Sequence, residues 1–128
     1  WKNPEPYFLQ KTAAGFQADP INDDQALLVE SPAGVIVILG CTHAGLLNTL
    51  RHIKTLVGKR RLYALLGGTH LLHASGEQLA GIMEAIREYD LQLVAPCHCT
   101  GILATLFFYQ VYGKKFAFCQ AGSVLEFP

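Results

Sequence analysis

Charged residues are scarce in this sequence: Asp, Glu, Lys and Arg make up 16% of its 128 residues, whereas about a quarter is usual in a soluble domain. Ten basic and ten acidic residues leave no net charge, so we expect neither a nucleic acid nor a membrane surface as a partner. Hydrophobic residues reach 51%. This apolar balance indicates burial on both faces of a sheet, an exposed interface, or a piece of a larger fold.

Long apolar runs are also missing. The longest, such as Val35–Leu39, fall far short of the roughly 18 residues that span a bilayer. The first residues, Trp1–Pro6, lack the apolar stretch of a signal peptide. We therefore expect a cytoplasmic location, in which the four cysteines remain thiols rather than disulfides.

Two common catalytic motifs do not occur. The sequence contains neither G-x-x-x-x-G-K-[ST], which binds phosphates, nor G-x-S-x-G, which presents a serine nucleophile. Candidate catalytic residues must therefore come from other parts of the sequence.

One transition does recur, and it is the main feature of the chain. Three apolar runs each end in a histidine flanked by Gly, Pro or Cys. The three segments are Val35–Leu39 followed by Gly40-Cys41-Thr42-His43-Ala44-Gly45, Leu62–Leu66 followed by Gly67-Gly68-Thr69-His70, and Leu91–Ala95 followed by Pro96-Cys97-His98-Cys99-Thr100-Gly101. Runs rich in Val, Ile and Leu are typical of buried strands. Layered folds place their sites beyond the carboxyl ends of such strands, so we expect the three ends to converge on one metal site.

The pattern predicts one α/β domain with a mixed sheet, residues 23–128, preceded by an irregular arm, residues 1–22. A strand at Ala26–Glu30 and the turn Ser31-Pro32-Ala33-Gly34 predict an antiparallel hairpin with the first buried run. Apolar residues at three- and four-residue spacings predict helices after each histidine segment. Short strands are expected at Phe116–Phe118 and Val124–Phe127.

Several of these residues are candidates for binding a metal. His43 and His98 are the expected ligands, because neutral imidazole suits zinc and similar divalent metals. His70 is expected as a further ligand or a proton-transferring residue. Three cysteines, Cys41, Cys97 and Cys99, are expected to pack beside the ligands rather than bind directly.

Other polar residues are more ambiguous. Asp23 and Asp24 precede a strand, where acidic residues either assist catalysis near a metal or simply form a turn; Asp24 is the better candidate. His52 is expected on a solvent-facing part of a helix, and His73 in a loop.

Five segments taken together resemble the metallo-β-lactamase superfamily. They are Asp23-Asp24-Gln25-Ala26-Leu27, Gly40–Gly45, Gly67-Gly68-Thr69-His70-Leu71, Ala95–Gly101 and Ala121–Phe127. The branch they resemble is that of 7,8-dihydropterin-6-yl-methyl-4-(β-D-ribofuranosyl)aminobenzene 5′-phosphate synthase. That branch shows D-D-Q-A-L, G-C-S-H-A-G, G-G-F-H-L and P-C-H-C-T-G in this order; here Thr42 replaces the Ser and Thr69 replaces the Phe.

The resemblance implies that this chain is the carboxyl-terminal half of such a domain. The superfamily motif H-x-H-x-D-H, which supplies about half the ligands of a two-metal site, does not occur in the sequence. The implied fold is half of a four-layer αββα sandwich, a mixed sheet with helices on one face. The implied partner is the missing amino-terminal half or a second copy of the chain.

The implied activity is hydrolysis, in which a metal-activated water attacks an ester or phosphoester of a small-molecule substrate. The cofactor would be Zn²⁺ or another divalent metal, with His43 and His98 as ligands and with His70 and Asp24 in the catalytic site. Two alternatives remain open at this point. In the first alternative, the chain is a non-catalytic interaction module with relic histidines. In the second, it is a thiol redox protein that uses Cys97 and Cys99.

Overall fold

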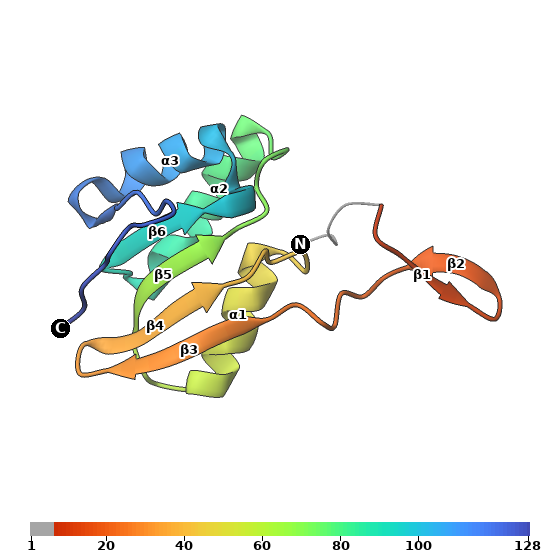
Figure 1. Ribbon diagram of the computed structural model, residues 1–128, viewed down its shortest axis with the longest axis horizontal. Helices are drawn as coiled ribbons and strands as arrows, with labels where there is room; N and C mark the ends of the chain where they lie inside the picture. Colours follow the sequence, from red (N-terminus) through yellow and green to blue (C-terminus); the bar gives the residue numbers. More distant parts are fainter. Residues whose placement is uncertain (1–6) are drawn as a thin grey trace.

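The computed structural model describes residues 7–128 of the chain (Figure 1). The strands and α-helices follow one another as β1 (Leu9–Thr12), β2 (Gly15–Ala18), β3 (Ala26–Ser31), β4 (Gly34–Leu39), α1 (Leu46–Val57), β5 (Leu62–Gly68), α2 (Gly76–Ile86), β6 (Leu93–Cys97) and α3 (Ile102–Tyr112). Three 3₁₀ turns lie at Arg87–Tyr89, His98–Thr100 and Gly113–Lys115. Within the described residues, no helix is both long enough and apolar enough to cross a membrane.

Four strands form the main sheet, in the order β3-β4-β5-β6. The first pair is antiparallel, as the four-residue turn predicted, and the next two pairs are parallel. Because β4, β5 and β6 run in one direction, their carboxyl ends lie along the same edge of the sheet (Figure 1). The three histidine segments therefore begin at neighbouring points.

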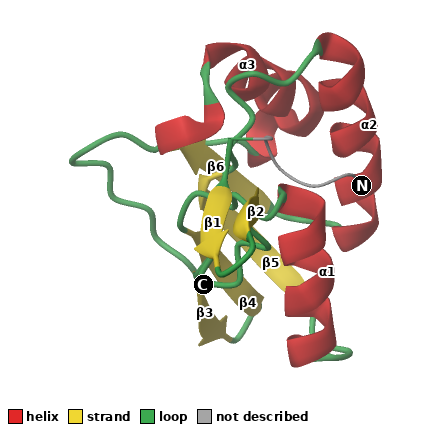
Figure 2. Ribbon diagram, turned by 90° about the vertical axis from the view of Figure 1, so that its right-hand side faces the viewer, coloured by secondary structure: helices red, strands yellow, loops and turns green. Residues whose placement is uncertain are grey.

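Helices cover one face of this sheet (Figure 2). Helix α1 contributes five buried apolar residues at the predicted spacing, including Leu50 at 0% exposure. They join residues of β4 and β5, helix α2 and Phe108 of α3 in one cluster of buried side chains. The prediction of an α/β domain with a mixed sheet and helices on one face is confirmed.

The opposite face of the sheet is apolar but only partly covered. Over its central strands, a cluster that includes Ile36 and Leu66 packs against Leu125 and Phe127 of the carboxyl-terminal segment. Toward the β3 edge, Leu27 pairs with Ile38 and is 60% exposed. An apolar strip on β3 and β4 thus remains open to solvent.

The irregular arm predicted for residues 1–22 is wrong for residues 9–18, where β1 and β2 form an antiparallel hairpin. The Thr12 hydroxyl closes the turn by donating to the Gly15 carbonyl and accepting from the Ala14 amide. Gly15 has a φ of +111°, which favours glycine. Residues 1–6 of the predicted arm lie outside the described residues, and the division between residues 22 and 23 stays a prediction.

The two predicted terminal strands are also wrong. Phe116 makes one isolated parallel bridge to Val94, supported by the Ala117 amide donating to the Val94 carbonyl, and the described chain has no further strand beyond it. The last residues instead cover the sheet with side chains, through Leu125 and Phe127. Their alternating apolar pattern therefore reflects packing onto a face rather than backbone pairing along an edge.

Candidate functional site

Each of the three strand ends turns sharply at a non-glycine residue. Thr42, His70 and His98 have φ values of +59°, +49° and +55°. Side chains disfavour this left-handed region, at a cost of order 1–3 kcal/mol for each residue, and such residues are concentrated at functional sites. The shared geometry folds all three segments back toward one another at the edge of the sheet.

Gly68 lets these segments come close together. Its amide donates to the Gly40 carbonyl over 3.0 Å. A Cβ at this position would overlap the Gly40 carbonyl oxygen and lie 2.9 Å from the Cys99 sulfur and 3.2 Å from the Cys41 Cα. Only glycine fits here without displacing its neighbours, so Gly68 sets how near Cys41 and Cys99 can be.

Cys41, His98 and Cys99 form a compact group of metal-binding side chains. Their ligand atoms all lie within 4.8 Å of one another. The His98 Nε2 is 3.0 Å from the Cys41 sulfur. The Cys99 sulfur accepts a hydrogen bond from the His70 amide over 3.3 Å and lies 3.6 Å from the Cys41 carbonyl oxygen. The His98 side chain is exposed, so the group is open to solvent on one side.

His43 and His70 form an adjacent pair. Their ring centroids are 4.5 Å apart in an edge-to-face arrangement. Phe8, just before β1, lies over both rings, with centroid distances of 4.8 Å to His43 and 6.1 Å to His70. Because the His70 amide contacts Cys99, this histidine pair borders the group around His98.

These placements bear on the ligands expected from the sequence. His98 gathers with two cysteines that were expected only to pack beside it, whereas the ring of His43 packs on His70. The three segments do converge. The assignment of His43 and His98 as metal ligands, and of His70 as a catalytic residue, stays a prediction.

Asp24 holds one of the converging segments in place. Its carboxylate oxygen Oδ2 accepts a hydrogen bond from the Ala44 amide over 2.6 Å. Helix α1 begins directly after this segment and has no side-chain cap of its own at Gly45. The structure thus shows Asp24 as a residue that positions the segment carrying His43, and its catalytic role stays a prediction.

Each of the four cysteines has at least one other cysteine nearby. Cys97 lies within hydrogen-bonding reach of Cys119, and burial followed by the Cys119 thiol raises the pKa of Cys97. Burial likewise raises the pKa of Cys99, which neighbours Cys41, while the His70 amide opposes that rise. The Cys99 thiol also raises the pKa of Cys97, so Cys97 lies near both Cys99 and Cys119, and the alternative of a redox protein that uses Cys97 and Cys99 stays a hypothesis.

Sequence reasoning missed several contributors. Thr69 and Thr100 are buried, and their hydroxyls form a 3.0 Å hydrogen bond that joins the ends of β5 and β6. Thr100 also donates to the Cys97 carbonyl over 2.7 Å. The sequence did carry one signal for these residues, because each of the three histidine segments contains a threonine. No local signal marks Phe8 or Cys119, since each reaches the site from a distant part of the chain.

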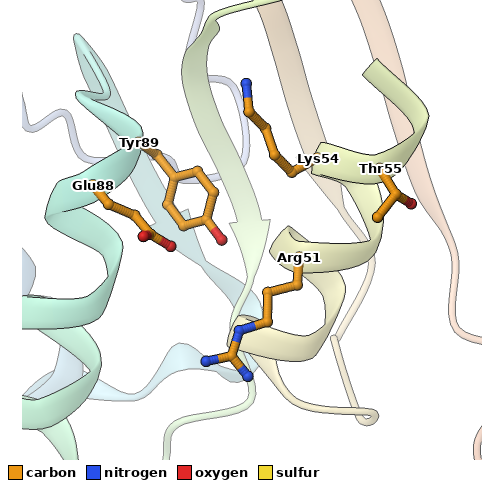
Figure 3. Close-up of a pocket in the computed structure, with 5 residues that line it drawn as sticks. All are labelled: Arg51, Lys54, Thr55, Glu88 and Tyr89. Carbon is orange, nitrogen blue, oxygen red and sulfur yellow. The ribbon is translucent and has the colours of Figure 1, made fainter. Parts of the chain in front are cut away.

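The remaining histidines lie outside this group. His52 is exposed on α1 and His73 is exposed in a turn before α2, as expected. A separate pocket of about 370 Å³ lies on the helical side, lined by residues of α1 and by Glu88 and Tyr89 (Figure 3). It shares no residue with the converging segments. Burial and the neighbouring Glu88 raise the pKa of Tyr89 there, and Arg51 opposes the rise.

Comparisons with known proteins show that this chain is similar to two curated proteins and to a solved structure, among others. A 7,8-dihydropterin-6-methyl-4-(beta-D-ribofuranosyl)-aminobenzene-5'-phosphate synthase of Methanocaldococcus jannaschii is 27% identical over 109 residues, which cover 85% of this chain and 37% of the synthase. An uncharacterized protein of the same organism is 30% identical over 107 residues, covering 84% of this chain and 38% of that protein. No protein-family model matches the chain.

The third is a crystal structure of a metal-dependent hydrolase of the β-lactamase superfamily, which matches with a TM-score of 0.88 and 34% sequence identity. The match covers 98% of this chain and 49% of the hydrolase. The chain therefore spans less than half the length of each of these three proteins.

Proposed function

We propose that this chain, which has the fold of half a metallo-β-lactamase-superfamily domain, supplies one wall of a metal-dependent hydrolase site. The observation that carries the proposal is the convergence of His43, His70 and His98 at one sheet edge, together with two thiols that are also metal-binding groups. The similarity to the crystal structure of a metal-dependent hydrolase supports it.

The side chains at this edge fit a divalent metal. Imidazole and thiolate are the donors that zinc and similar borderline metals prefer, and the exposed side of the group leaves room for a further ligand. When bound, such a metal lowers the pKa of a water ligand and polarises an ester or phosphoester. In the proposal, His43 and His98 hold metal in the intact two-metal site. The imidazole of His70 accepts or donates a proton there, and the Asp24 carboxylate fixes the Ala44 amide.

The remaining ligands are proposed to come from the other half of the domain. This chain lacks H-x-H-x-D-H and matches only half of the similar hydrolase. The open strip that contains Leu27 and Ile38 is apolar, as expected of a face that a second sheet covers. We propose the missing half as the partner of this face; a second copy of the chain is the competing occupant. The substrate is proposed to be a small molecule.

The longest natural polypeptide that contains this chain provides the test. Loaded with zinc or manganese, it should hydrolyse a chromogenic phosphodiester or carboxylic ester, and a chelator should abolish the reaction until metal is restored. The variant His52→Ala serves as a control, because this exposed histidine on α1 lies outside the site. Hydrolysis that continues unchanged in the presence of the chelator would overturn the proposal. Absence of hydrolysis of both probes by the metal-loaded protein would also overturn it, and would favour a non-catalytic module.

A further inference from the structure

Cys97 and Cys119 are a pair of thiols that the proposed metal site does not use. We propose that they form a site of reversible oxidation, at which a peroxide joins the Cys97 and Cys119 sulfurs in a disulfide. The disulfide fastens the carboxyl-terminal segment, residues 116–128, to the end of β6. The inference depends on the packing around the two cysteines and does not rest on the proposed hydrolysis.

The backbone brings the two cysteines level with each other. The carboxyl-terminal segment runs beside β6, where Phe116 makes a parallel bridge to Val94 (Figure 1), and each cysteine follows its member of this bridged pair by three residues. Neighbouring strands lie about 4.8 Å apart, and the two Cα atoms of a disulfide usually lie about 4.4–6.8 Å apart. Pro96 lacks the amide hydrogen that would continue the pairing. A link between the side chains therefore takes over where backbone pairing ends.

The two cysteine side chains also lie on the same face of the sheet. Side chains two residues apart along an extended chain share a face. Ala95 and Ala117, each two residues before a cysteine, belong to the apolar cluster on the face opposite the helices, and Cys119 packs against the same cluster. The Cys97 thiol lies within hydrogen-bonding reach of the Cys119 thiol. Both cysteines are free thiols in the structure, and side-chain rotation is enough to bring their sulfurs together.

The left-handed turn at His98 separates this pair from the other two cysteines. The Cys99 sulfur lies 3.6 Å from the Cys41 carbonyl oxygen, on the side of the neighbouring strand ends. Burial raises the pKa of Cys97 most, followed by the Cys119 thiol and then by the Cys99 thiol. This order agrees with Cys119 as the nearer partner of Cys97, and a disulfide between Cys97 and Cys99 is the competing product.

A small oxidant has access to both sulfurs. The two cysteines are half-buried and line a pocket of about 350 Å³ between the end of β6, the start of α3 and the carboxyl-terminal segment. Apolar side chains, among them Leu106 and Phe118, form much of its wall. Hydrogen peroxide is uncharged and small enough to enter such a pocket, so it is the oxidant that we propose.

One peroxide molecule is consumed for each disulfide. The sulfur of one cysteine attacks a peroxide oxygen, the O–O bond breaks, and a sulfenic acid and one water form. The sulfur of the second cysteine then attacks the sulfenic acid sulfur, the S–O bond breaks, and the hydroxyl group leaves as a second water with the proton of the second thiol. The two thiols supply the two electrons that reduce the peroxide. A dithiol reverses the modification by thiol–disulfide exchange.

Peptide mapping of the longest natural polypeptide that contains this chain tests the inference. The polypeptide is reduced, freed of metal with a chelator, treated with hydrogen peroxide, alkylated at its remaining thiols and digested with trypsin. Trypsin places Cys41 in the peptide 12–51, Cys97 and Cys99 in the peptide 88–114, and Cys119 in the peptide 116–128. The expected main disulfide product within this chain is the peptide 88–114 linked to the peptide 116–128, and dithiothreitol should separate the two.

Serine variants identify the two sulfurs. Cys97→Ser and Cys119→Ser should each abolish the linked product, whereas Cys99→Ser and the control Cys41→Ser should retain it. Oxidation should also slow amide hydrogen exchange in residues 116–128 by at least about threefold, because the disulfide restricts local opening of this segment. The Cys119→Ser variant should show no such slowing, and far-ultraviolet circular dichroism confirms that each variant is folded.

Three results would overturn the inference. The first is a main disulfide product within the peptide 88–114, or between that peptide and the peptide 12–51. The second is a folded polypeptide in which peroxide forms no disulfide between cysteines of this chain. The third is a linked product that persists in Cys97→Ser. None of these results affects chelator-sensitive hydrolysis by the reduced polypeptide, so the two proposals can fail separately.

Discussion

Replacing His98 with alanine should reduce metal-dependent hydrolysis by the longest natural polypeptide containing this chain at least about a hundredfold. His98 follows the carboxyl end of β6, and its Nε2 lies 3.0 Å from the Cys41 sulfur. Removing the imidazole takes away a nitrogen donor that no neighbouring residue of the group replaces, since the other two donors are sulfurs. Steady-state rates on the phosphodiester or ester probe measure the effect.

The same substitution should leave the fold nearly intact. The His98 side chain is exposed, so no packing is lost, but alanine tolerates the left-handed backbone conformation at this position somewhat less well than histidine does. The free energy of unfolding should therefore fall by no more than about 1 kcal/mol. His52→Ala provides the matched control, a histidine-to-alanine change at an exposed position of α1. If His98→Ala hydrolysed the probe as fast as the His52→Ala control, the assignment of His98 to the site would be wrong.

The second large effect is expected from Gly67→Ala. Gly67 lies near the carboxyl end of β5 with a φ of +105°. A Cβ there would overlap the Leu39 carbonyl oxygen and lie 2.9 Å from the Leu39 nitrogen, both in the backbone of the neighbouring strand. The backbone of β4 cannot move aside without breaking its pairing with β5, so we expect a loss of roughly 3–5 kcal/mol in the free energy of unfolding.

Gly15→Ala is the control for this prediction. Gly15 has a similar φ of +111°, but nothing lies within 4 Å of the position its Cβ would take. Gly15→Ala therefore strains the backbone but creates no steric clash, and it should lower the free energy of unfolding by about 1–2 kcal/mol. Urea unfolding followed by circular dichroism compares the two. Equal losses for both variants would show that the contact between β5 and β4 is looser than the structure describes.

The order and type of the main elements were predictable because their apolar patterns are local. Val35–Leu39 and Leu62–Leu66 are continuous apolar runs, and both form buried strands of the main sheet. The start of α2 is likewise local, because Ser75 and Gln78 form a capping box there, a pattern that is visible in the sequence. The resemblance to half of a metallo-β-lactamase domain, carried by the segments around His43, His70 and His98, is confirmed by the similar hydrolase structure.

What the sequence did not reveal depends on contacts between distant residues. Phe8 covers His43 and His70 from before β1, and no pattern in residues 7–22 connects it to them. The segment from Phe116 to Phe127 alternates like strands, but it packs its side chains on the sheet instead of extending it. Periodicity indicates which residues are apolar on one side; it does not determine what lies against that side.

The grouping of His98 with Cys41 and Cys99 illustrates the same limit within the site. In an extended segment, Cys97, His98 and Cys99 would alternate sides, which is why the cysteines were expected to support rather than bind. The left-handed turn at His98 breaks that alternation. Whether a residue other than glycine adopts such a turn depends on the packing around it, here on Gly68 and the buried pair Thr69 and Thr100.

Metal analysis of the longest natural polypeptide that contains this chain tests most directly the claim that these strand ends form part of a metal site. After reduction, incubation with zinc and passage through a desalting column, it should retain at least about one zinc ion per chain. The same treatment of His98→Ala should leave substantially less, while His52→Ala should match the unmodified chain. Zinc below roughly 0.2 ions per folded chain, which is too little for a site of ordinary structural affinity, would contradict the account.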